Sequence, residues 1–357
     1  MDISQQGVLA PSGFVTRFVG RDRELDRLRR SVDWPDPQRG RVVQVTGDPG
    51  IGKTRLLGEF AAQARAAGVP VLWGQASEFE SNVPCGVFIN ALDDHVSGLR
   101  PERLADLGDE HRTLLQAAGP FRLGSARGGG ADLMGVERFR LHRAMRALFE
   151  VLAEPEGLVL VLDDVHWADS GSRELLDYLL RNPPRARLVL ALAHRPRQIP
   201  ARLADALAQA QARGTAELVA VGPLSLADVE TLLGPDVEDA RRRELFEASG
   251  GNPFYLEALT RDGTRGSKVR GRPCGEDDIG VEGGVPIAVQ AALSAELAAL
   301  SEVELRVAGA AAVAGDTFDS TLVARIAQCD TQVALVACDR LAERDLIRPQ
   351  RAPGTWG

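Results

Sequence analysis

Short apolar runs alternate with amphipathic segments along the first two thirds of the chain. Residues 158–162 are apolar at every position, which indicates a strand buried on both faces, as in a parallel sheet covered by helices. The alternation of such runs with segments of helical spacing predicts an α/β fold. The predicted strands are 41–45, 69–74, 158–162, 187–193 and 216–221. The predicted helices among them are 21–32, 56–68, 87–96, 102–118, 137–152, 170–180 and 202–212.

The pattern changes after residue 222, where helices replace the alternation. Three short helices are predicted at 225–233, 237–248 and 253–259. Residues 261–284 contain seven glycines and almost no apolar residue, which is typical of a linker. Four helices and a short strand without an apparent partner follow, at 286–300, 302–313, 320–327, 331–344 and 346–349. We therefore predict a tail (1–16), a sheet domain (17–222), a helical lid subdomain (223–260), a flexible linker (261–284) and a second domain (285–357).

Composition narrows the class of protein. The chain has 357 residues, of which 44% are hydrophobic and 26% charged, as is ordinary for a globular protein. Its net charge of −8 argues against non-specific nucleic-acid binding as the main task. The four cysteines lack the spacing of a metal site or disulfide framework, and neither a secretion signal nor a membrane span is apparent. These features favour a soluble cytoplasmic protein without a membrane partner.

A glycine-rich loop joins the strand at 41–45 to the helix that follows. Its sequence, Gly47-Asp-Pro-Gly-Ile-Gly-Lys-Thr54, places converging backbone amides at a helix N-terminus, an arrangement that binds phosphate. We expect the amides from Gly50 to Thr54 to hold the phosphates, Lys53 to reach the β- and γ-phosphates, and the Thr54 hydroxyl to bind Mg²⁺. The lysine is informative because Lys53 and Lys268 are the only two in the sequence.

Two acids follow the apolar strand at 158–162. Because ligands gather at the carboxyl ends of parallel strands, Asp163 and Asp164 are expected at the same edge as the glycine-rich loop. We expect Asp163 to hold Mg²⁺ through water, and Asp164 to orient or deprotonate the water that attacks the γ-phosphate. The sequence leaves open which Asp performs which task.

Other polar residues lie near these motifs. Arg195 follows the strand at 187–193, so its guanidinium is placed either to distinguish ATP from ADP or simply on the surface. Asn252 and Pro253 fit the N-cap and first residue of a helix. For His166, packing or an indirect role is favoured over a metal site, because no second His or Cys stands at ligand spacing.

Together these motifs resemble the ATPase module of the LuxR-type large ATP-binding transcriptional regulators, within the AAA-related STAND class of signal-transduction ATPases. The resemblance covers roughly residues 17–260 and, more loosely, 285–350. It is carried by GDPGIGKT at 47–54, LVLVLDDVHWAD at 158–169, FVGRDREL at 18–25, LVLALAHR at 188–195, PLSLADVETLL at 223–233 and SGGNPFYLEAL at 249–259.

This resemblance implies a P-loop NTPase sheet with an extra strand between the loop strand and the Asp163 strand. It implies adenine near Val19, Gly20, Arg21 and Pro253, and makes Arg195 the γ-phosphate sensor. It also implies that ATP and ADP states differ in how the helical and winged-helix-like parts close on the nucleotide. The expected nucleotide-binding residues of the loop are Gly47, Gly50, Ile51, Gly52, Lys53, Thr54 and Arg55.

The chain departs from the family pattern at its C-terminal end. Regulators of this kind usually continue into a sensor region and a helix-turn-helix, so we expect a fragment or isolated module whose winged-helix-like domain is truncated. DNA binding is assigned only to that helix-turn-helix, which this chain lacks.

We therefore expect an ATP-binding regulatory module with slow, Mg²⁺-dependent hydrolysis to ADP and phosphate. Three alternatives stay open: a fast oligomeric ring ATPase with an arginine supplied in trans, a DNA-binding protein acting through 285–357, and a phosphotransferase with the same core. The sequence also leaves open whether ATP drives self-association.

Overall fold

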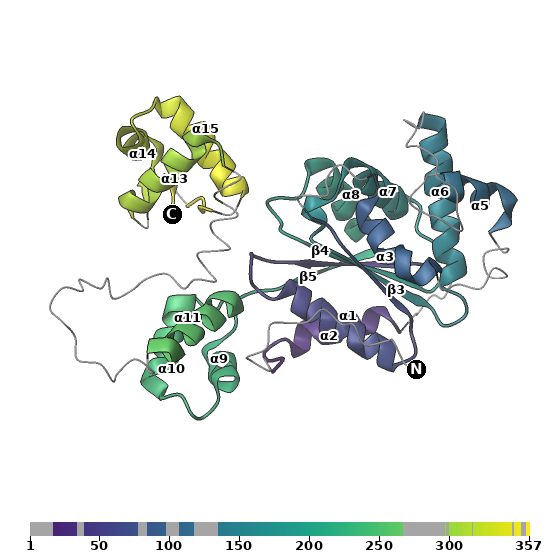
Figure 1. Cartoon of the computed structure of the whole chain (residues 1–357), viewed down its shortest axis with the longest axis horizontal. Coiled ribbons are helices and arrows are strands. Elements are labelled where there is room, and N and C mark those ends of the chain that lie inside the picture. The colour runs from purple at the N-terminus through teal and green to yellow at the C-terminus, as the bar shows by residue number, and fades with distance from the viewer. Residues whose placement is uncertain are drawn as a thin grey trace.

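The computed structural model describes residues 17–33, 39–77, 84–97, 107–117, 135–266, 297, 300–315, 317–344, 346–350 and 355–357 (Figure 1). The predicted tail 1–16, most of the predicted linker and most of the helix predicted at 286–300 lie outside these residues.

A five-stranded parallel sheet forms the centre of the first domain. Its strand order is β2-β3-β4-β1-β5, so β4 lies between β1 and β3, as the resemblance implied. Every residue of β3 and β4 is buried, which confirms the expectation of a sheet covered on both faces. The strands are β1 (Arg41–Thr46), β2 (Val71–Gln75), β3 (Leu158–Asp163), β4 (Leu188–His194) and β5 (Ala216–Ala220).

Helices cover the two faces of this sheet. Alternate residues of β3 point to opposite faces: Val159 and Val161 join the core beneath α1 and α2, whereas Leu160 joins the larger core on the other side. Figure 1 shows α1 and α2 on one side of the sheet and α3, α6, α7 and α8 on the other. The bounds are α1 (Asp22–Ser31), α2 (Lys53–Ala66), α3 (Gly86–Ser97), α5 (Gly108–Ala117), α6 (Gly135–Leu152), the 3₁₀ turn η2 (Val165–Trp167), α7 (Ser170–Arg181) and α8 (Ala201–Ala212).

Three helices, α9 (Leu226–Leu233), α10 (Asp239–Ser249) and α11 (Pro253–Gly266), follow the sheet and share a small core that includes Val229 and Leu256. The helix predicted at 253–259 continues to Gly266, six residues into the predicted linker. Glycine disfavours a helix interior only weakly, so its abundance here lowers helix propensity without ending the hydrogen-bond ladder.

The C-terminal part packs three helices around its own core, together with the strand pair β6–β7 and with residues 346–350, which pair with 355–357 and form with them what we call the C-terminal hairpin. Its elements are α13 (Glu302–Ala314), β6 (Phe318–Asp319), α14 (Ser320–Ala327), α15 (Thr331–Glu343) and β7 (Thr355–Trp356). The strand predicted at 346–349 does have a partner: Pro349 pairs with Trp356, and Arg348 exchanges backbone hydrogen bonds with Gly357. Sequence reasoning missed this pairing because the two segments are too short to show a strand period.

Asp169 joins two helices on one face of the sheet. Its buried carboxylate caps α7 by accepting from the Ser172 amide at 2.9 Å, and it also accepts from the amides of Cys85 and Gly86 at 2.8 and 3.0 Å, where α3 begins. These amides belong to helix N-termini, so they have no partner within their own helices. One side chain therefore fixes the starts of α3 and α7 together.

Among the described residues, no helix is both long and apolar enough to cross a membrane.

We expect Asp169→Ala to lower the free energy of unfolding by about 3 kcal/mol, because it removes one helix cap and leaves further buried amides without an acceptor. Urea denaturation followed by circular dichroism measures the loss. Asp169→Asn is the matched control and should lose less, since its amide oxygen still accepts. A loss below about 0.5 kcal/mol in the Ala variant would contradict this role.

Candidate nucleotide site

The predicted site residues meet at the carboxyl edge of the sheet. The glycine-rich loop follows β1, Asp163 ends β3, and Arg195 comes directly after β4. Since β4 lies between β1 and β3, these three strand ends are neighbours. The structure therefore brings together residues that are more than 100 positions apart in the sequence, such as Thr54 and Asp163.

The backbone of the loop depends on glycine. Gly50 and Gly52 have φ angles of 70° and 99°, in the left-handed region that side chains disfavour. A Cβ on Gly47 would lie 2.6 Å from the Val221 carbonyl oxygen, so this position is also closed to larger residues. Helix α2 begins directly afterwards at Lys53, which sets its first amides toward the loop.

Lys53 is buried against this loop. Its Nζ donates to the carbonyl oxygens of Gly47 and Asp48 at 2.9 and 3.0 Å. Burial lowers the pKa of Lys53, the nearby Arg195 lowers it further, and Asp164 and Asp163 partly oppose these effects. The ammonium group therefore lies in a partly desolvated position where an anion would stabilise its charge.

Thr54 and Asp163 form a direct link across the site. The Thr54 hydroxyl donates to Asp163 Oδ2 at 2.7 Å, and the Asp164 amide donates to Asp163 Oδ1 at 3.0 Å. Asp163 is fully buried, and this burial, together with the charge of Asp164, raises its pKa from 3.8 to about 6. The charged form of this carboxyl group is thus less stable here than in water.

Asp164 differs from its neighbour in exposure and conformation. Its φ of 54° is left-handed, and its side chain is 28% exposed, so water can reach it. Gln75 Nε2, at the end of β2, lies 3.5 Å from Asp164 Oδ2. His166 Nδ1 lies 4.0 Å from Asp164 Oδ1.

Arg195 lies near the same groups. It is half-buried, and its charge lowers the pKa of both Lys53 and His166, which places it on the side of the site where these residues meet. The preceding His194 is buried, with a pKa that burial lowers to about 4. Four basic groups are thus gathered here, and the two imidazoles among them are neutral at pH 7.

Residues 19–21, which the resemblance places near adenine, contact the glycine-rich loop through Arg21. The buried Arg21 guanidinium donates to the carbonyl oxygens of Ile51 and Gly222 at 3.3 and 2.5 Å. Gly20 allows close approach to α9, because a Cβ there would lie 2.4 Å from Asp228 Cγ. Val19 precedes this contact and is half-buried.

Residues around Pro253 contact the loop in a way that sequence reasoning missed. Asn252 caps α11 as predicted, with its Oδ1 accepting from the Phe254 amide at 3.0 Å. Its Nδ2 also donates to the Pro49 carbonyl oxygen at 2.9 Å, and Gly50 lies tightly against Phe254. The predicted residue Pro253 begins α11 between these two contacts, whereas Arg55 is exposed in the first turn of α2.

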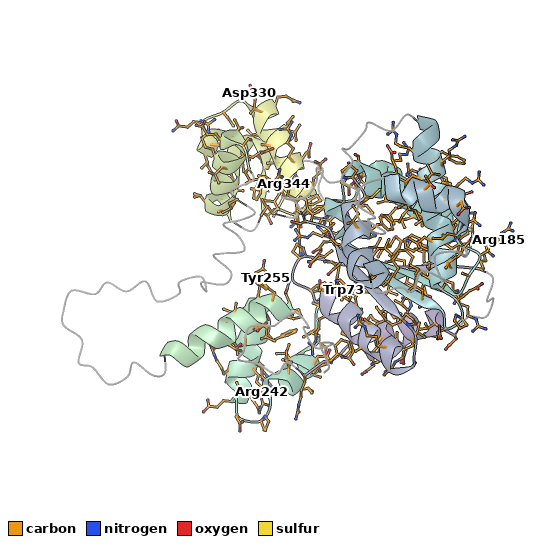
Figure 2. The ribbon with its side chains drawn as sticks, turned by 45° about the vertical axis from the view of Figure 1, so that its right-hand side comes forward. Trp73, Arg185, Arg242, Tyr255, Asp330 and Arg344 are labelled. Atoms are coloured by element: carbon orange, nitrogen blue, oxygen red, sulfur yellow. The ribbon has the colours of Figure 1, made fainter. Side chains whose placement is uncertain are left out.

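The C-terminal hairpin also reaches the loop. Arg348 donates to Asp48 Oδ2 at 2.7 Å, and Gln198 donates to the Arg344 carbonyl oxygen at 3.1 Å. Figure 2 shows Arg344 on the side of the C-terminal part that faces the sheet. No sequence motif marks these contacts, because they join segments about 300 residues apart in one case and 146 in the other.

The donor set suits a magnesium nucleotide. Mg²⁺ prefers hard oxygen ligands and keeps several waters, so it needs only one or two protein groups beside phosphate oxygens. The Thr54 hydroxyl and the Asp163 carboxylate supply such oxygens side by side. Within the described residues, no cluster of three or more His, Cys, Asp or Glu could hold a metal ion.

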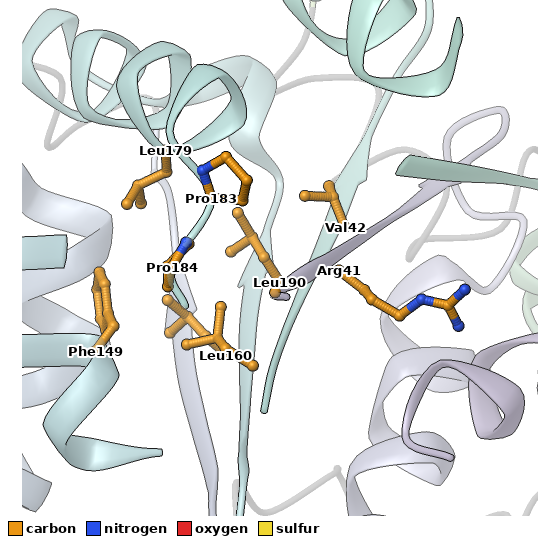
Figure 3. A pocket seen from close by; sticks show the side chains of 10 residues that line it. Arg41, Val42, Phe149, Leu160, Leu179, Pro183, Pro184 and Leu190 are labelled. Atoms are coloured by element: carbon orange, nitrogen blue, oxygen red, sulfur yellow. The ribbon is translucent and has the colours of Figure 1, made fainter. Parts of the chain in front are cut away.

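A small pocket elsewhere has a different character. It lies at the opposite edge of the sheet, near the starts of β1 and β4, and Figure 3 shows mainly apolar side chains such as Phe149 and Leu160 around it, while Arg41 points away. Without converging polar groups it does not suit phosphate.

The first part of the chain matches a protein family, and a longer part of it is similar to an uncharacterized protein. The profile of the family described as AAA ATPase domain matches residues 17–192, which include the glycine-rich loop, Asp163 and Asp164. An uncharacterized protein of Rhizobium meliloti (strain 1021) is 26% identical over 267 residues, or 68% of this chain and 24% of that protein. This chain thus matches about a quarter of the length of that relative.

Solved structures that align with this one include Cdc6p from Pyrobaculum aerophilum, with a TM-score of 0.47 and 13% identity. That alignment covers 98% of this chain and 92% of the Cdc6p chain. Drosophila ORC bound to DNA has a TM-score of 0.46 and 14% identity, covering 97% and 85%. The Thermotoga maritima RuvB Holliday junction branch migration motor has a TM-score of 0.40 and 14% identity, covering 95% and 92%.

The sheet order and the family match define the class of protein. The first domain has the parallel P-loop NTPase fold, and its residues 17–192 are similar to the family described as AAA ATPase domain. Arg195 and Pro253 lie outside the matched residues.

The raised pKa of Asp163 gives a pH-dependent prediction for the metal-free protein. Its folded pKa, about 6, exceeds the unfolded value of 3.8, so its contribution to stability is present below pH 4 and is lost as the pH rises through about 6. The free energy of unfolding of Asp163→Asn minus that of wild type should therefore be larger at pH 8 than at pH 4, by on the order of 2 kcal/mol. Urea denaturation in EDTA measures this difference, and a value independent of pH would contradict the assignment.

Proposed function

We propose that this chain is an ATP-binding regulatory module that hydrolyses ATP slowly with Mg²⁺. The observation that carries the proposal is the meeting of Lys53, Thr54 and Asp163 at one sheet edge, with the Thr54 hydroxyl 2.7 Å from the Asp163 carboxylate. A buried ammonium, a hydroxyl and a carboxylate at the N-terminus of a helix match the needs of a triphosphate and its metal.

Binding would exchange contacts that the free chain already makes. Lys53 Nζ would leave the carbonyl oxygens of Gly47 and Asp48 for the β- and γ-phosphates, which are stronger acceptors. The amides from Gly50 to Thr54 would hold the phosphate oxygens. Mg²⁺, when bound, would neutralise phosphate charge, and Thr54 and Asp163 would hold it.

Hydrolysis requires a water in line with the γ-phosphate. Asp164, which water can reach, would orient this water and accept its proton as the oxygen attacks phosphorus. The bond from the γ-phosphorus to the bridging oxygen breaks, ADP leaves with that oxygen, and phosphate is released. Arg195 would contact the γ-phosphate and so distinguish ATP from ADP.

Contacts around the loop support a regulatory role. The loop touches α11 through Asn252 and the C-terminal hairpin through Arg348, so a change in loop conformation would alter both. The Asp48–Arg348 pair is exposed, with side chains 49% and 62% accessible, and exposed ion pairs are worth at most about 1 kcal/mol. Such a contact can open and close at low cost, as a nucleotide-controlled switch requires.

The wider role rests on the sequence resemblance to LuxR-type large ATP-binding regulators. In this proposal the chain is the ATPase module of a transcriptional regulator in the cytoplasm, and it binds nucleotide rather than DNA. The length of the curated relative is in keeping with a module that occurs within larger proteins.

Lys53→Ala should weaken ATP binding at least about 100-fold, because it removes the cation that holds the phosphates. Isothermal titration calorimetry with Mg²⁺ measures the affinity. The matched control is Lys268→Ala, the same change at the other lysine of the sequence, which should leave the affinity unchanged. Unchanged affinity in Lys53→Ala would refute the site.

Arg195→Ala should weaken the binding of ATP about tenfold while leaving ADP affinity within about twofold, because the contact involves only the γ-phosphate. Competition against a fluorescent ADP analogue gives both affinities. Arg197→Ala, an exposed arginine two residues further on, serves as the control. Equal losses for ATP and ADP would rule out γ-phosphate sensing.

A further inference from the structure

His166 is a buried polar side chain that the proposed hydrolysis does not yet use. Its side chain is fully inaccessible to solvent, and neither ring nitrogen has a hydrogen-bond partner among the described residues. Buried polar groups without partners are rare in folded proteins, and each one calls for a physical reason. Its ring packs beside that of Trp167, with centroids 5.2 Å apart and planes tilted by 42°, but this contact leaves its two nitrogens unexplained.

The carboxylate of Asp164 lies close to this ring. His166 Nδ1 lies 4.0 Å from Asp164 Oδ1, while Gln75 Nε2 lies 3.5 Å from Oδ2 of the same carboxylate. Both distances exceed those of a normal hydrogen bond. Contacts at an active site are often long before substrate binds and tighten afterwards.

We propose that His166 is a positioning residue for Asp164: its Nδ1–H donates to Asp164 Oδ1 and fixes the carboxylate that orients the attacking water. The inference rests on the proposed hydrolysis and extends it to a residue that does not touch the nucleotide. Each carboxylate oxygen accepts more than one hydrogen bond, so the water keeps an acceptor.

The surroundings keep the ring in the form that this role needs. Burial, together with the charges of Arg195 and Lys53, lowers the pKa of His166 to about 3. The ring is therefore neutral, carries one N–H, and donates without competing with Asp164 for the proton of the water.

Two variants with opposite predictions test this role. His166→Asn places an amide donor where Nδ1 lies, and His166→Phe keeps an apolar ring of similar size but has no donor. In the full chain with Mg²⁺, we expect the Phe variant to lower kcat for ATP hydrolysis about tenfold or more, with KM and the Kd of a non-hydrolysable ATP analogue within about twofold of wild type. The Asn variant should keep most of the wild-type kcat.

His166→Gln is a third variant, whose amide lies where Nε2 lies, and we expect it to be as slow as the Phe variant. Thermal unfolding shows which variants fold. If the Phe variant does not fold, the comparison of kcat between the Asn and Gln variants tests the inference. Wild-type kcat in the Phe variant, or equal losses in Asn and Gln, would overturn the inference. Absence of hydrolysis by the wild-type chain would instead refute the proposed activity, and the inference with it.

Discussion

The candidate site depends on the hydrogen bond from the Thr54 hydroxyl to Asp163 Oδ2. Several features of the sheet domain are needed to bring these two groups together. The bond joins the first turn of α2 to the end of β3, although β4 separates β3 from β1. This requires a loop that returns tightly from β1, which the left-handed glycines allow, and a strand that is buried along its whole length. A shift of either element by one residue would separate the two oxygens.

The charges around this bond are arranged for a ligand rather than for the stability of the free chain. Burial lowers the pKa of Lys53 and raises that of Asp163, so each group is held where its charged form is disfavoured. A triphosphate beside Lys53 and a divalent cation beside Asp163 would favour both charged forms at once. Opposite pKa shifts in two neighbouring groups are common at functional sites.

Much of this arrangement could be predicted from the sequence. The strand, glycine-rich loop and helix around Lys53 are consecutive, so local periodicity and glycine spacing suffice to place them. The apolar run before Asp163 predicts a central parallel strand for the same reason. The extra strand β4 was implied by the resemblance, and the sheet order confirms it.

What the sequence did not reveal depends on contacts between distant segments. Asn252 was predicted as a helix cap, yet its other amide atom bonds the loop at Pro49, which no local pattern signals. No local pattern signals the contact between Arg348 and Asp48 either. The position of Asp169 before α7 predicts that it caps this helix, but not that it also binds the start of α3. For His166 the sequence predicted packing or an indirect role, but only its burial and its distance to Asp164 suggest which residue it acts on.

A crystal structure of the chain with Mg²⁺ and a non-hydrolysable ATP analogue tests the central claim most directly. We predict phosphate oxygens on the amides from Gly50 to Thr54, Lys53 Nζ moved from the Gly47 and Asp48 carbonyl oxygens to the phosphates, and Mg²⁺ beside Thr54 and Asp163. A nucleotide bound elsewhere, or one bound while Lys53 keeps its contacts to the loop carbonyls, would contradict the claim.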